Sequence, residues 1–572
     1  MDEQPVIGLV GSGPAAEAVE AAGTDVDARV EAIDTDEAGG VDLPVVVAPS
    51  GRSAFRTVDG TADGPWIAVE LGGVGGRAMD HVDAAVSVCD PTGGCFDCLR
   101  ARVRSNADGA PADAPTTTRR DARLAGAHAG RLAAGVLAGE VEPGRLLELP
   151  HAERRFLPVP GCGCTKPSSR TLDRTHETVS VEAAVDRMEA AVDDRVGLVA
   201  EIGEVHSFPA PYYLARLCDT TTFADAEAGP QAAGVDVDWN AAFAKAVGEA
   251  LERYAAGVYR RSRFDVAAAT DLDEAVPPSA FVRPEGFETF GPEEPIPWLP
   301  GESLHDGRSV ALPAEFVVFP PPAHRFAPSI TTGLGLGTSG VGALHSGLYE
   351  VVERDATMLA WYSSFDPMGL RVEDPGFETL ARRARAEDLS VTPLLLTQDV
   401  DVPIVAVAVH REGEWPRFAV GSGASLDAND AARSALAEGL QNWMELRAMG
   451  NERSAEESTA IGEYADLPDA ARSMLAVDAT VAAADLGPAE PPTGEAEIAA
   501  VAERLDAVGL EAFAARLTTP DLERLGLEVV RVLVPGAQPL FTGEAFFGDR
   551  AETVPRDLGF EPRLDRAPHP YP

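Results

Sequence analysis

Lysine is almost absent from this chain of 572 residues. It occurs only at Lys166 and Lys245, so nearly all of the 47 basic residues are arginine. No basic stripe accompanies the formal net charge of -45, and this excludes the usual way of binding DNA or RNA. A hydrophobic fraction of 45% excludes a disordered acidic chain, and the length allows two to four domains with large cores.

Long hydrophobic runs are lacking as well. No stretch of about 18 uncharged apolar residues is present, so we expect no membrane span. The N-terminus, MDEQPVIGLV, has neither a positive segment nor a long apolar core, so we expect no signal peptide and a cytoplasmic protein. Abundant acid with so little lysine resembles the composition of halophilic proteins, whose surfaces stay hydrated in concentrated salt. We therefore ascribe the charge to the solvent and not to a partner.

Cysteine is scarce, and six residues in so long a chain do not make a disulfide scaffold. Four of them form two tight pairs, Cys95-x-x-Cys98 and Cys162-x-Cys164. Each pair is typical of half a tetrahedral zinc site, and four thiolates leave no open position, which favours structural zinc. Two unrelated thiol pairs, or a redox switch, are the alternatives.

One arrangement of charged residues occurs twice: two glutamates three positions apart, with an arginine directly after the second. The two copies are Glu249, Glu252 and Arg253, and Glu350, Glu353 and Arg354. Residues three apart share a helix face, so each copy points two carboxylates the same way. A single pair among 92 acids would be an ordinary solvated face. The apolar neighbours and the repetition instead favour a cage of four carboxylates, able to hold a divalent metal and, through it, phosphates.

The alternation of strand-like and helix-like segments predicts an α/β (α+β) protein. Long Ala-rich helices are expected at 240–260, 340–362 and 427–449, and a mostly helical, polar region at 453–528. A polar linker at 165–180 predicts a boundary between a small first domain, 1–170, and a large second one, 171–572.

The first domain begins with a strand, a Gly-rich turn, a helix and a second strand. Gly11-x-Gly13-x-x-Ala16 opens the helix, and Asp34 ends the second strand. Taken alone, this spacing is a fingerprint of a Rossmann-like dinucleotide site. The rest of the N-terminal region argues against a working dehydrogenase.

Three stretches of the second domain resemble the signatures of YcaO-domain proteins. They are WNAAFAKAVGEALERYAAGVY, TTGLGLGTSGVGALHSGLYEVVERDA and GSGASLDANDAARSALAEGLQ. The ending, from LEVVRVLVPGAQPLF to APHPYP, resembles that of the azoline-forming subset, the TOMM or bacteriocin-type cyclodehydratases. These matches span about residues 180–572 and imply a large YcaO domain with a Pro-rich C-terminus.

The resemblance implies ATP chemistry on a peptide backbone. The glutamates of both copies, Glu249, Glu252, Glu350 and Glu353, would hold Mg²⁺ that bridges the ATP phosphates, and Arg253 and Arg354 would help to neutralise the nucleotide. The second and third signatures add Thr338, Glu438 and Gln441 to the nucleotide pocket, although the last two equally fit an ordinary helix surface. In the azoline-forming subset the Pro-rich end reaches the active site, which assigns a catalytic part to Pro568, Pro570 and Pro572. A frayed tail is the alternative.

Two positions depart from the family pattern. Val235 stands where a Gly-Lys-Gly segment often carries its lysine, and Gly342 stands where an acid is expected before Ala343. Both changes bear on nucleotide affinity.

The stretch PWIAVELGGVGGRAMDHVDAAVSVCDPTGGCFDCLRAR resembles the E1-like (ThiF-related) module, with its zinc cysteines, that accompanies azoline-forming YcaO proteins. The resemblance implies a small Rossmann-like domain with structural Zn²⁺ that engages the substrate or a partner. No winged-helix segment is recognisable, so we expect a separate protein to bind the leader peptide. A homodimer is also expected from the family.

The sequence thus predicts an ATP- and Mg²⁺-dependent cyclodehydratase that forms thiazoline or oxazoline rings in a ribosomally made precursor peptide. A thioamide-forming YcaO enzyme and a catalytically silent peptide-binding scaffold are the alternatives.

Overall fold

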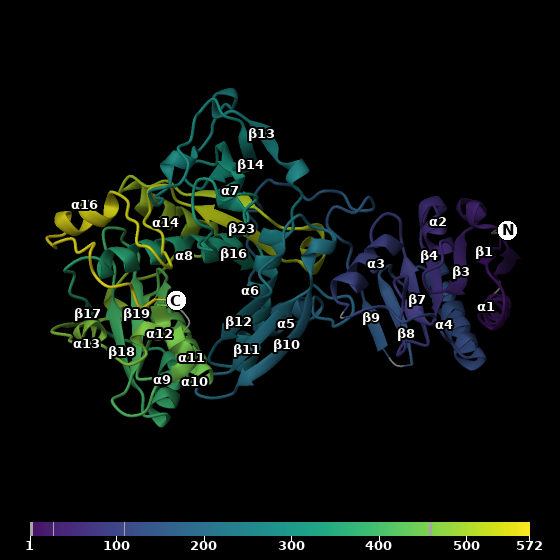
Figure 1. Ribbon diagram of the computed structural model, residues 1–572, viewed down its shortest axis with the longest axis horizontal. Helices are drawn as coiled ribbons and strands as arrows, with labels where there is room; N and C mark the ends of the chain where they lie inside the picture. Colours follow the sequence, from purple (N-terminus) through teal and green to yellow (C-terminus); the bar gives the residue numbers. More distant parts are fainter. Residues whose placement is uncertain (1–3, 27, 108, 151, 457–459, 572) are drawn as a thin grey trace.

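The computed structural model describes residues 4–571 except 27, 108, 151 and 457–459. Within these residues the chain is a mixed α/β protein, as expected, with sheets of seven, six, five and three strands and a two-stranded ribbon. The seven-stranded sheet lies at one end of the molecule, and the larger part of the chain lies beside it (Figure 1). No helix among the described residues is both long and apolar enough to cross a bilayer.

The seven-stranded sheet has the strand order β2-β1-β3-β4-β7-β8-β9. Its strands are β1 (Val6–Val10), β2 (Arg29–Ala32), β3 (Leu43–Pro49), β4 (Trp66–Leu71), β7 (Ala84–Cys89), β8 (Arg145–Leu149) and β9 (Ala152–Arg155). The pairs among the first four are parallel and the remaining pairs are antiparallel. Continuous apolar runs such as that of β3 are buried on both faces, because helices cover the sheet on each side.

Helices α1 (Pro14–Asp25) and α4 (Arg119–Leu137) pack on one face, and α2 (Ala54–Thr61) and α3 (Phe96–Ser105) pack on the other. The ribbon of β5 (Gly73–Val74) and β6 (Arg77–Ala78) follows β4. Small residues let α1 and α4 approach closely: a Cβ at Gly126 would lie 2.1 Å from the Ala15 carbonyl oxygen. Gly11 has a similar packing role, since a Cβ there would lie 2.2 Å from the Val47 oxygen.

Residues 156–180, all of them described, form no helix or strand and connect this sheet to α5 (Val181–Glu189). A three-stranded antiparallel sheet follows, made of β10 (Val199–His206), β11 (Tyr212–Leu217) and β12 (Gln231–Val235). The predicted boundary at residue 170 remains a prediction. One hydrophobic cluster includes apolar side chains from both sides of it, among them Leu99 and Leu251.

The six-stranded sheet contains β13 (Asp265–Ala267), β14 (Ile296–Ser303), β15 (Ser309–Pro313), β16 (Leu334–Gly337), β22 (Phe513–Arg516) and β23 (Glu528–Leu533). The five-stranded sheet contains β17 (Met368–Arg371), β18 (Ser390–Leu395), β19 (Ile404–His410), β20 (Phe418–Ala424) and β21 (Thr480–Ala482). The helices of this part are α6 (Trp239–Gly257), α7 (Ala314–Val317), α8 (Gly340–Trp361), α9 (Pro375–Ala386), α10 (Ala428–Met449), α11 (Asn451–Glu456), α12 (Ala460–Tyr464), α13 (Asp469–Met474), α14 (Glu495–Asp506), α15 (Pro520–Leu525) and α16 (Arg550–Asp557).

The three long helices predicted from the sequence are confirmed as α6, α8 and α10. The description of 453–528 as mostly helical is wrong in one respect, because this region also supplies β21 and β22. All four residues of β22 are buried, and it pairs with both β14 and β23. The buried Arg516 in β22 donates two hydrogen bonds to Glu528, at 2.8 and 2.7 Å, so the sequence FAAR is a core strand that carries a paired charge.

Candidate active site

Three strand–helix pairs bring the acids predicted from the sequence together: β12 with α6, β16 with α8, and β20 with α10. Each helix also contacts the strand of the next pair, α6 with β16, α8 with β20 and α10 with β12. The three pairs therefore close on one another, and each helix carries one glutamate at a corresponding position.

Glycines in the three strands allow this packing. A Cβ at Gly234, Gly335 or Gly423 would lie 2.2, 2.3 or 2.4 Å from a backbone atom of the helix that follows. Any side chain at these positions would push the helix away from its strand, so glycine is required by the close approach.

Each helix carries a glutamate 15 residues after the strand glycine, at Glu249, Glu350 and Glu438. Each carboxylate accepts a hydrogen bond from a backbone N–H of the preceding strand or of the turn that leads into it. The donors are Ala233 at 3.0 Å, Gly333 at 2.9 Å and Ser422 at 2.5 Å. Glu438 therefore occupies the place in α10 that Glu249 and Glu350 occupy in α6 and α8. From the sequence alone, Glu438 fitted either the nucleotide pocket or an ordinary helix surface.

The second acids, Glu252 and Glu353, lie one turn further along α6 and α8. Burial, together with the like charges of Glu350 and Glu249, raises the pKa of Glu252 well above its usual value. Burial raises the pKa of Glu353 to about 7, although the Arg354 charge and a 2.6 Å hydrogen bond from the Ser422 hydroxyl act against the shift.

Gln441 takes the corresponding place in α10. Its side-chain nitrogen donates to Glu445 at 3.1 Å, and the Tyr212 hydroxyl of β11 donates to the same carboxylate oxygen at 2.9 Å. Gln441 is thus tied to a neighbouring carboxylate and to the three-stranded sheet.

Arginines compensate part of this negative charge. Arg253 forms an ion pair with Glu249. The Arg354 guanidinium lies 4.0 Å from Glu350 and 3.8 Å from Glu438. Arg354 therefore bridges the second and third strand–helix pairs.

Arg531 of β23 is a third cation that the sequence analysis missed. It is buried and donates to the carbonyl oxygens of Thr331 and Ile330, at 2.7 and 2.9 Å. Burial lowers its pKa to about 10, while the charges of Glu350 and Glu252 act in the opposite direction. An isolated arginine within the apolar run EVVRVL was the available signal, because a buried charge needs a partner.

The donor set fits a divalent cation. Carboxylate oxygens are ligands that Mg²⁺ prefers, and burial raises the pKa of both Glu252 and Glu353, so a bound cation would favour their charged forms. Among the described residues, no three of these carboxylates offer oxygens within 4.8 Å of one another. The acids therefore line the walls of a site and do not form a compact all-protein cage.

The Pro-rich end of the chain lies beside α8. The Pro568 ring is exposed, but its carbonyl oxygen accepts a hydrogen bond from the Tyr464 hydroxyl. His569 is buried and its Nε2 lies 2.7 Å from the carbonyl oxygen of Phe541. Pro570 is buried as well. The described part of the tail is therefore held in place and does not fray.

The last described residue, Tyr571, is 1% exposed. Its pKa is raised by burial and, to a smaller extent, by the negative charge of Glu353. The described tail thus approaches the second glutamate pair. Pro572 lies outside the described residues.

The positions that depart from the family pattern have distinct surroundings. Val235 is buried in β12. A Cβ at Gly342 would meet nothing closer than the Ser339 hydroxyl at 3.4 Å, so the missing acid leaves space at the start of α8. Thr338, just before that helix, is half-buried, and its carbonyl oxygen accepts from Arg187 at 3.2 Å.

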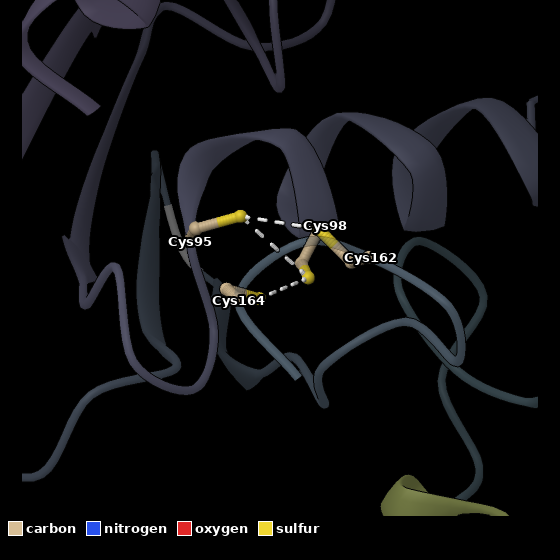
Figure 2. A group of neighbouring side chains, drawn as sticks. All are labelled: Cys95, Cys98, Cys162 and Cys164. Carbon is tan, nitrogen blue, oxygen red and sulfur yellow. Dashed lines mark hydrogen bonds between the residues drawn. The ribbon is translucent and has the colours of Figure 1, made fainter. Parts of the chain in front are cut away.

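The four predicted cysteines come together at the start of α3 (Figure 2). The sulfur–sulfur distances are 3.8 Å for Cys95 and Cys98, 3.5 Å for Cys95 and Cys162, and 3.3 Å for Cys98 and Cys164. A disulfide needs about 2.05 Å, whereas sulfurs about 2.3 Å from a tetrahedral ion lie about 3.8 Å apart. The geometry fits a Cys₄ metal site and not two disulfides.

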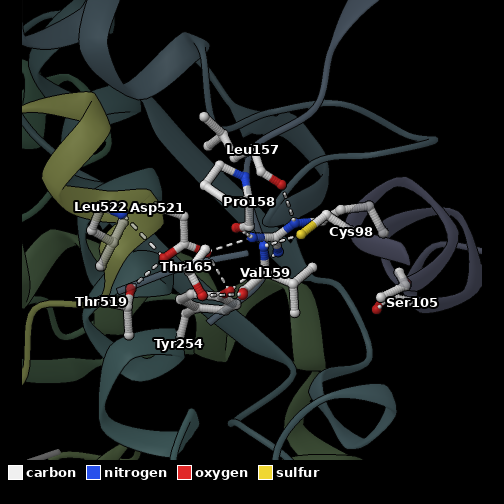
Figure 3. Close-up of polar contacts among 12 residues, drawn as sticks. Cys98, Ser105, Leu157, Pro158, Val159, Thr165, Tyr254, Thr519, Asp521 and Leu522 are labelled. Carbon is white, nitrogen blue, oxygen red and sulfur yellow. Dashed lines mark hydrogen bonds and ion pairs between the residues drawn. The ribbon is translucent and has the colours of Figure 1, made fainter. Parts of the chain in front are cut away.

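Next to this cluster, a buried ion pair joins α3 to α15, and Tyr254 of α6 contacts the same carboxylate (Figure 3). Arg102 of α3 and Asp521 of α15 lie 2.5 Å apart with both side chains fully buried. The Tyr254 hydroxyl donates to the same carboxylate oxygen at 2.6 Å and accepts from Arg102 at 3.1 Å. Because Tyr254 directly follows Arg253, the network reaches the helix that carries the first glutamate pair.

Arg102 also donates to the carbonyl oxygens of Leu157 and Pro158, at 3.3 and 2.9 Å. The neighbouring Val159 N–H donates to the Cys98 sulfur at 3.2 Å. The cysteine cluster, α3 and α6 are therefore connected through one set of polar contacts.

Comparisons with known proteins agree with this geometry. Residues 233–538 match the family model of the YcaO cyclodehydratases, described as ATP- and Mg²⁺-binding. Because the match covers more than half of the chain, the protein belongs to the YcaO family, and the predicted enzyme class, an ATP-dependent peptide cyclodehydratase, is confirmed. A comparison with curated proteins gave no match.

Solved structures share the fold. A heterocyclase described as in complex with substrate and cofactor covers 99% of this chain and 86% of its own, with a TM-score of 0.75 and 21% identity. The heterocyclase TruD covers 97% and 82%, with a TM-score of 0.66 and 19% identity. YcaO from Methanopyrus kandleri, described as bound with AMPPCP and Mg²⁺, covers 62% and 91%, with a TM-score of 0.50 and 26% identity.

Proposed function

We propose that the protein uses ATP and Mg²⁺ to form thiazoline or oxazoline rings in a ribosomally made precursor peptide. The observation that carries the proposal is the common placement of Glu249, Glu350 and Glu438 on three strand–helix pairs that close on one another. The YcaO structure from Methanopyrus kandleri, described as bound with AMPPCP and Mg²⁺, supports a nucleotide at this kind of site.

In this proposal the glutamates hold Mg²⁺ together with the ATP phosphates. Glu249, Glu252, Glu350 and Glu353 would supply carboxylate oxygens to the ion, for which the described residues alone form no compact cage. The ion supplies charge neutralisation for the transferred phosphoryl group. Arg253, Arg354 and Arg531 offset the remaining negative charge, and Thr338, Glu438 and Gln441 border the nucleotide.

The reaction activates an amide oxygen, which is a very poor leaving group. The side chain of Cys, Ser or Thr in the peptide gives up its proton to solvent and attacks the preceding carbonyl carbon, and the new bond closes a five-membered ring and leaves an oxyanion. That oxygen takes the terminal phosphoryl group of ATP, which releases ADP. The C–O bond then breaks as phosphate leaves, the amide nitrogen loses its proton and a C=N double bond forms within the ring. The protein contributes position and charge compensation.

The proposal gives the Pro-rich tail a place in this chemistry. We assign a catalytic part to Pro568, Pro570 and Pro572, the last of which lies outside the described residues. Tyr571, between the last two, is buried, and the charge of Glu353 contributes to its raised pKa. A tail fixed in this way can line the space where the peptide amide must meet the nucleotide.

We also propose a Rossmann-like, E1-related module with structural Zn²⁺ for residues 1–170. The parallel order of β2, β1, β3 and β4 and the Cys₄ geometry support it. The heterocyclase described as in complex with substrate and cofactor supports a peptide substrate. A leader-binding protein and a second copy of the chain are the proposed partners.

The direct test is to incubate the protein with ATP, Mg²⁺ and a precursor peptide encoded beside its gene, with the leader-binding protein present. We expect the loss of one water per ring by mass spectrometry, and at least about a thousandfold slower conversion by Glu353→Ala. Asp430→Asn, on the outer side of α10, is the matched control and should act like wild type.

Equal conversion by wild type and Glu353→Ala would refute the assignment of this carboxylate. Replacement of oxygen by sulfur would instead establish the thioamide reaction. Peptide binding without ATP consumption would establish the silent scaffold.

A further inference from the structure

We propose that an arginine-lined groove on the N-terminal part binds an extended, acidic peptide segment. Two adjoining cavities of about 530 and 570 Å³ share Gly76, Asp97 and Arg100, and together they form the groove along α3. Its cations come from three neighbouring segments: Arg52, Arg56, Arg77, Arg100 and Arg104. We call this surface the arginine groove.

A buried carboxylate holds the backbone that lines the groove. Glu70, at the end of β4 and 1% exposed, accepts hydrogen bonds from the Ser50 hydroxyl at 2.9 Å and from the N–H groups of Gly75 and Gly76 at 2.6 and 2.7 Å. Both glycines have positive φ, 58° and 74°, which other residues rarely adopt. The rim is therefore bare backbone in a defined position, which leaves room for another chain.

The charge of the groove contrasts with that of the molecule. Asp59 is turned inward and accepts from the Phe96 N–H at 2.9 Å and from the Trp66 side chain at 3.1 Å. Asp97 lies 2.7 Å from Arg100 and 3.6 Å from Arg56.

Two acids thus face five arginines, and within the described part of the chain Arg52 and Arg104 form no ion pair. A positive groove on a chain of net charge -45 selects an anionic ligand locally.

The spacing of the cations fits an extended peptide. Arg100 and Arg104 stand four residues apart on α3, so their side chains leave the helix about 6 Å from each other. In an extended chain, alternate side chains repeat every ~6.7 Å on the same side. Carboxylates at alternate positions of a peptide can therefore meet both guanidinium groups at once.

The groove ends at the junction of the two parts of the molecule. Thr222, which belongs to the larger part, borders the second cavity, and its hydroxyl lies 2.6 Å from that of Ser105 at the end of α3. A segment bound here would be held against the YcaO part. This assignment rests on the proposed function, because the occupant is taken to be a non-reacting segment of the substrate peptide.

The test uses the full chain and a fluorescent peptide with alternating Glu and Ser residues, followed by anisotropy. A Gln and Ser peptide of the same length is the uncharged control. We expect Arg100→Glu/Arg104→Glu to weaken binding of the acidic peptide by at least about tenfold. Arg119→Glu/Arg123→Glu is the matched control, because these exposed arginines have the same spacing on α4, across the sheet.

Binding should also weaken as KCl is raised, since exposed charges are screened. Equal affinity for the two peptides, or an unchanged affinity of the Arg100→Glu/Arg104→Glu variant, would overturn the inference. Displacement by inorganic phosphate at equal concentration would assign the groove to phosphate-bearing ligands instead. If rings form but the acidic peptide does not bind in the arginine groove, only the assignment of the groove is refuted. If the peptide binds there but no rings form, only the proposed function is refuted.

Discussion

At the scale of single residues, Lys245 stands out because the chain otherwise uses arginine for its positive charge. Its ammonium lies 2.7 Å from Asp236, and its charge helps to lower the pKa of Glu438, which burial raises. A compact ammonium at this place can contact a phosphate as a point charge. It stands near Val235, where the family pattern often has lysine.

We expect Lys245→Met to raise the KM for ATP by about tenfold, as the loss of one hydrogen bond to a charged group would. The measurement is ATP consumption at saturating peptide, with circular dichroism as a check of folding. Lys166→Met is the natural control, because it removes the other lysine of the chain. An unchanged KM in Lys245→Met would show that this ammonium serves only its ion pair with Asp236.

The buried carboxyl group of Glu70 makes the free energy of unfolding depend on pH. Burial raises its pKa to about 6, from a usual value near 4.5. The folded protein thus holds the proton more tightly than the unfolded chain. This stabilisation is complete below the unfolded pKa and is lost as the pH rises through about 6, and its size is about 2 kcal/mol.

We expect the melting temperature of wild type, relative to that of Glu70→Gln, to fall between about pH 4.5 and pH 7. Differential scanning fluorimetry of both proteins in the same salt provides the measurement. A constant difference across this range would contradict the shifted pKa.

At the scale of elements, the three strand–helix pairs make Glu438 equivalent to the first glutamates of α6 and α8. We expect Glu438→Gln to raise the Mg²⁺ concentration for half-maximal activity by about tenfold, because it removes one negative charge and keeps an acceptor for the Ser422 N–H. A Mg²⁺ titration of ATP consumption measures this, with Asp430→Asn on the same helix as control. Unchanged Mg²⁺ dependence would place Glu438 outside the metal site.

The long helices could be predicted because their apolar positions recur with helical spacing, and the four cysteines because tight pairs are rare. The equivalence of Glu438 was available in the sequence as the common spacing from Gly234 to Glu249 and from Gly423 to Glu438. Only the hydrogen bonds from the strands show that this spacing matters.

Other parts could not be predicted, because they depend on contacts between distant segments. Arg531 meets Glu350 and Glu252 only after β23 pairs with β16. The strand β22 is short and Ala-containing, and its identity is set by β14 and β23 on either side. Local residue propensities predict neither of these features.

At the scale of the whole molecule, the two parts are joined by a charge pair that water does not reach. Arg102 and Asp521 are both fully buried, and the pair is completed by Tyr254 and the backbone of residues 157–158. Removal of one partner leaves a buried charge uncompensated, at a cost of about 3–5 kcal/mol. Such a change should also shift α6, because Tyr254, which contacts both members of the pair, belongs to that helix.

We expect Arg102→Met to lower the melting temperature and to raise the KM for ATP, whereas Arg102→Met/Asp521→Asn should recover most of both losses because neither charge remains. Calorimetry and ATP kinetics on the two variants and on Asp521→Asn complete a double-mutant cycle. Additive losses in the cycle would contradict the coupling. A loss of stability with an unchanged KM would show that the ion pair holds the two parts of the molecule together but does not position α6.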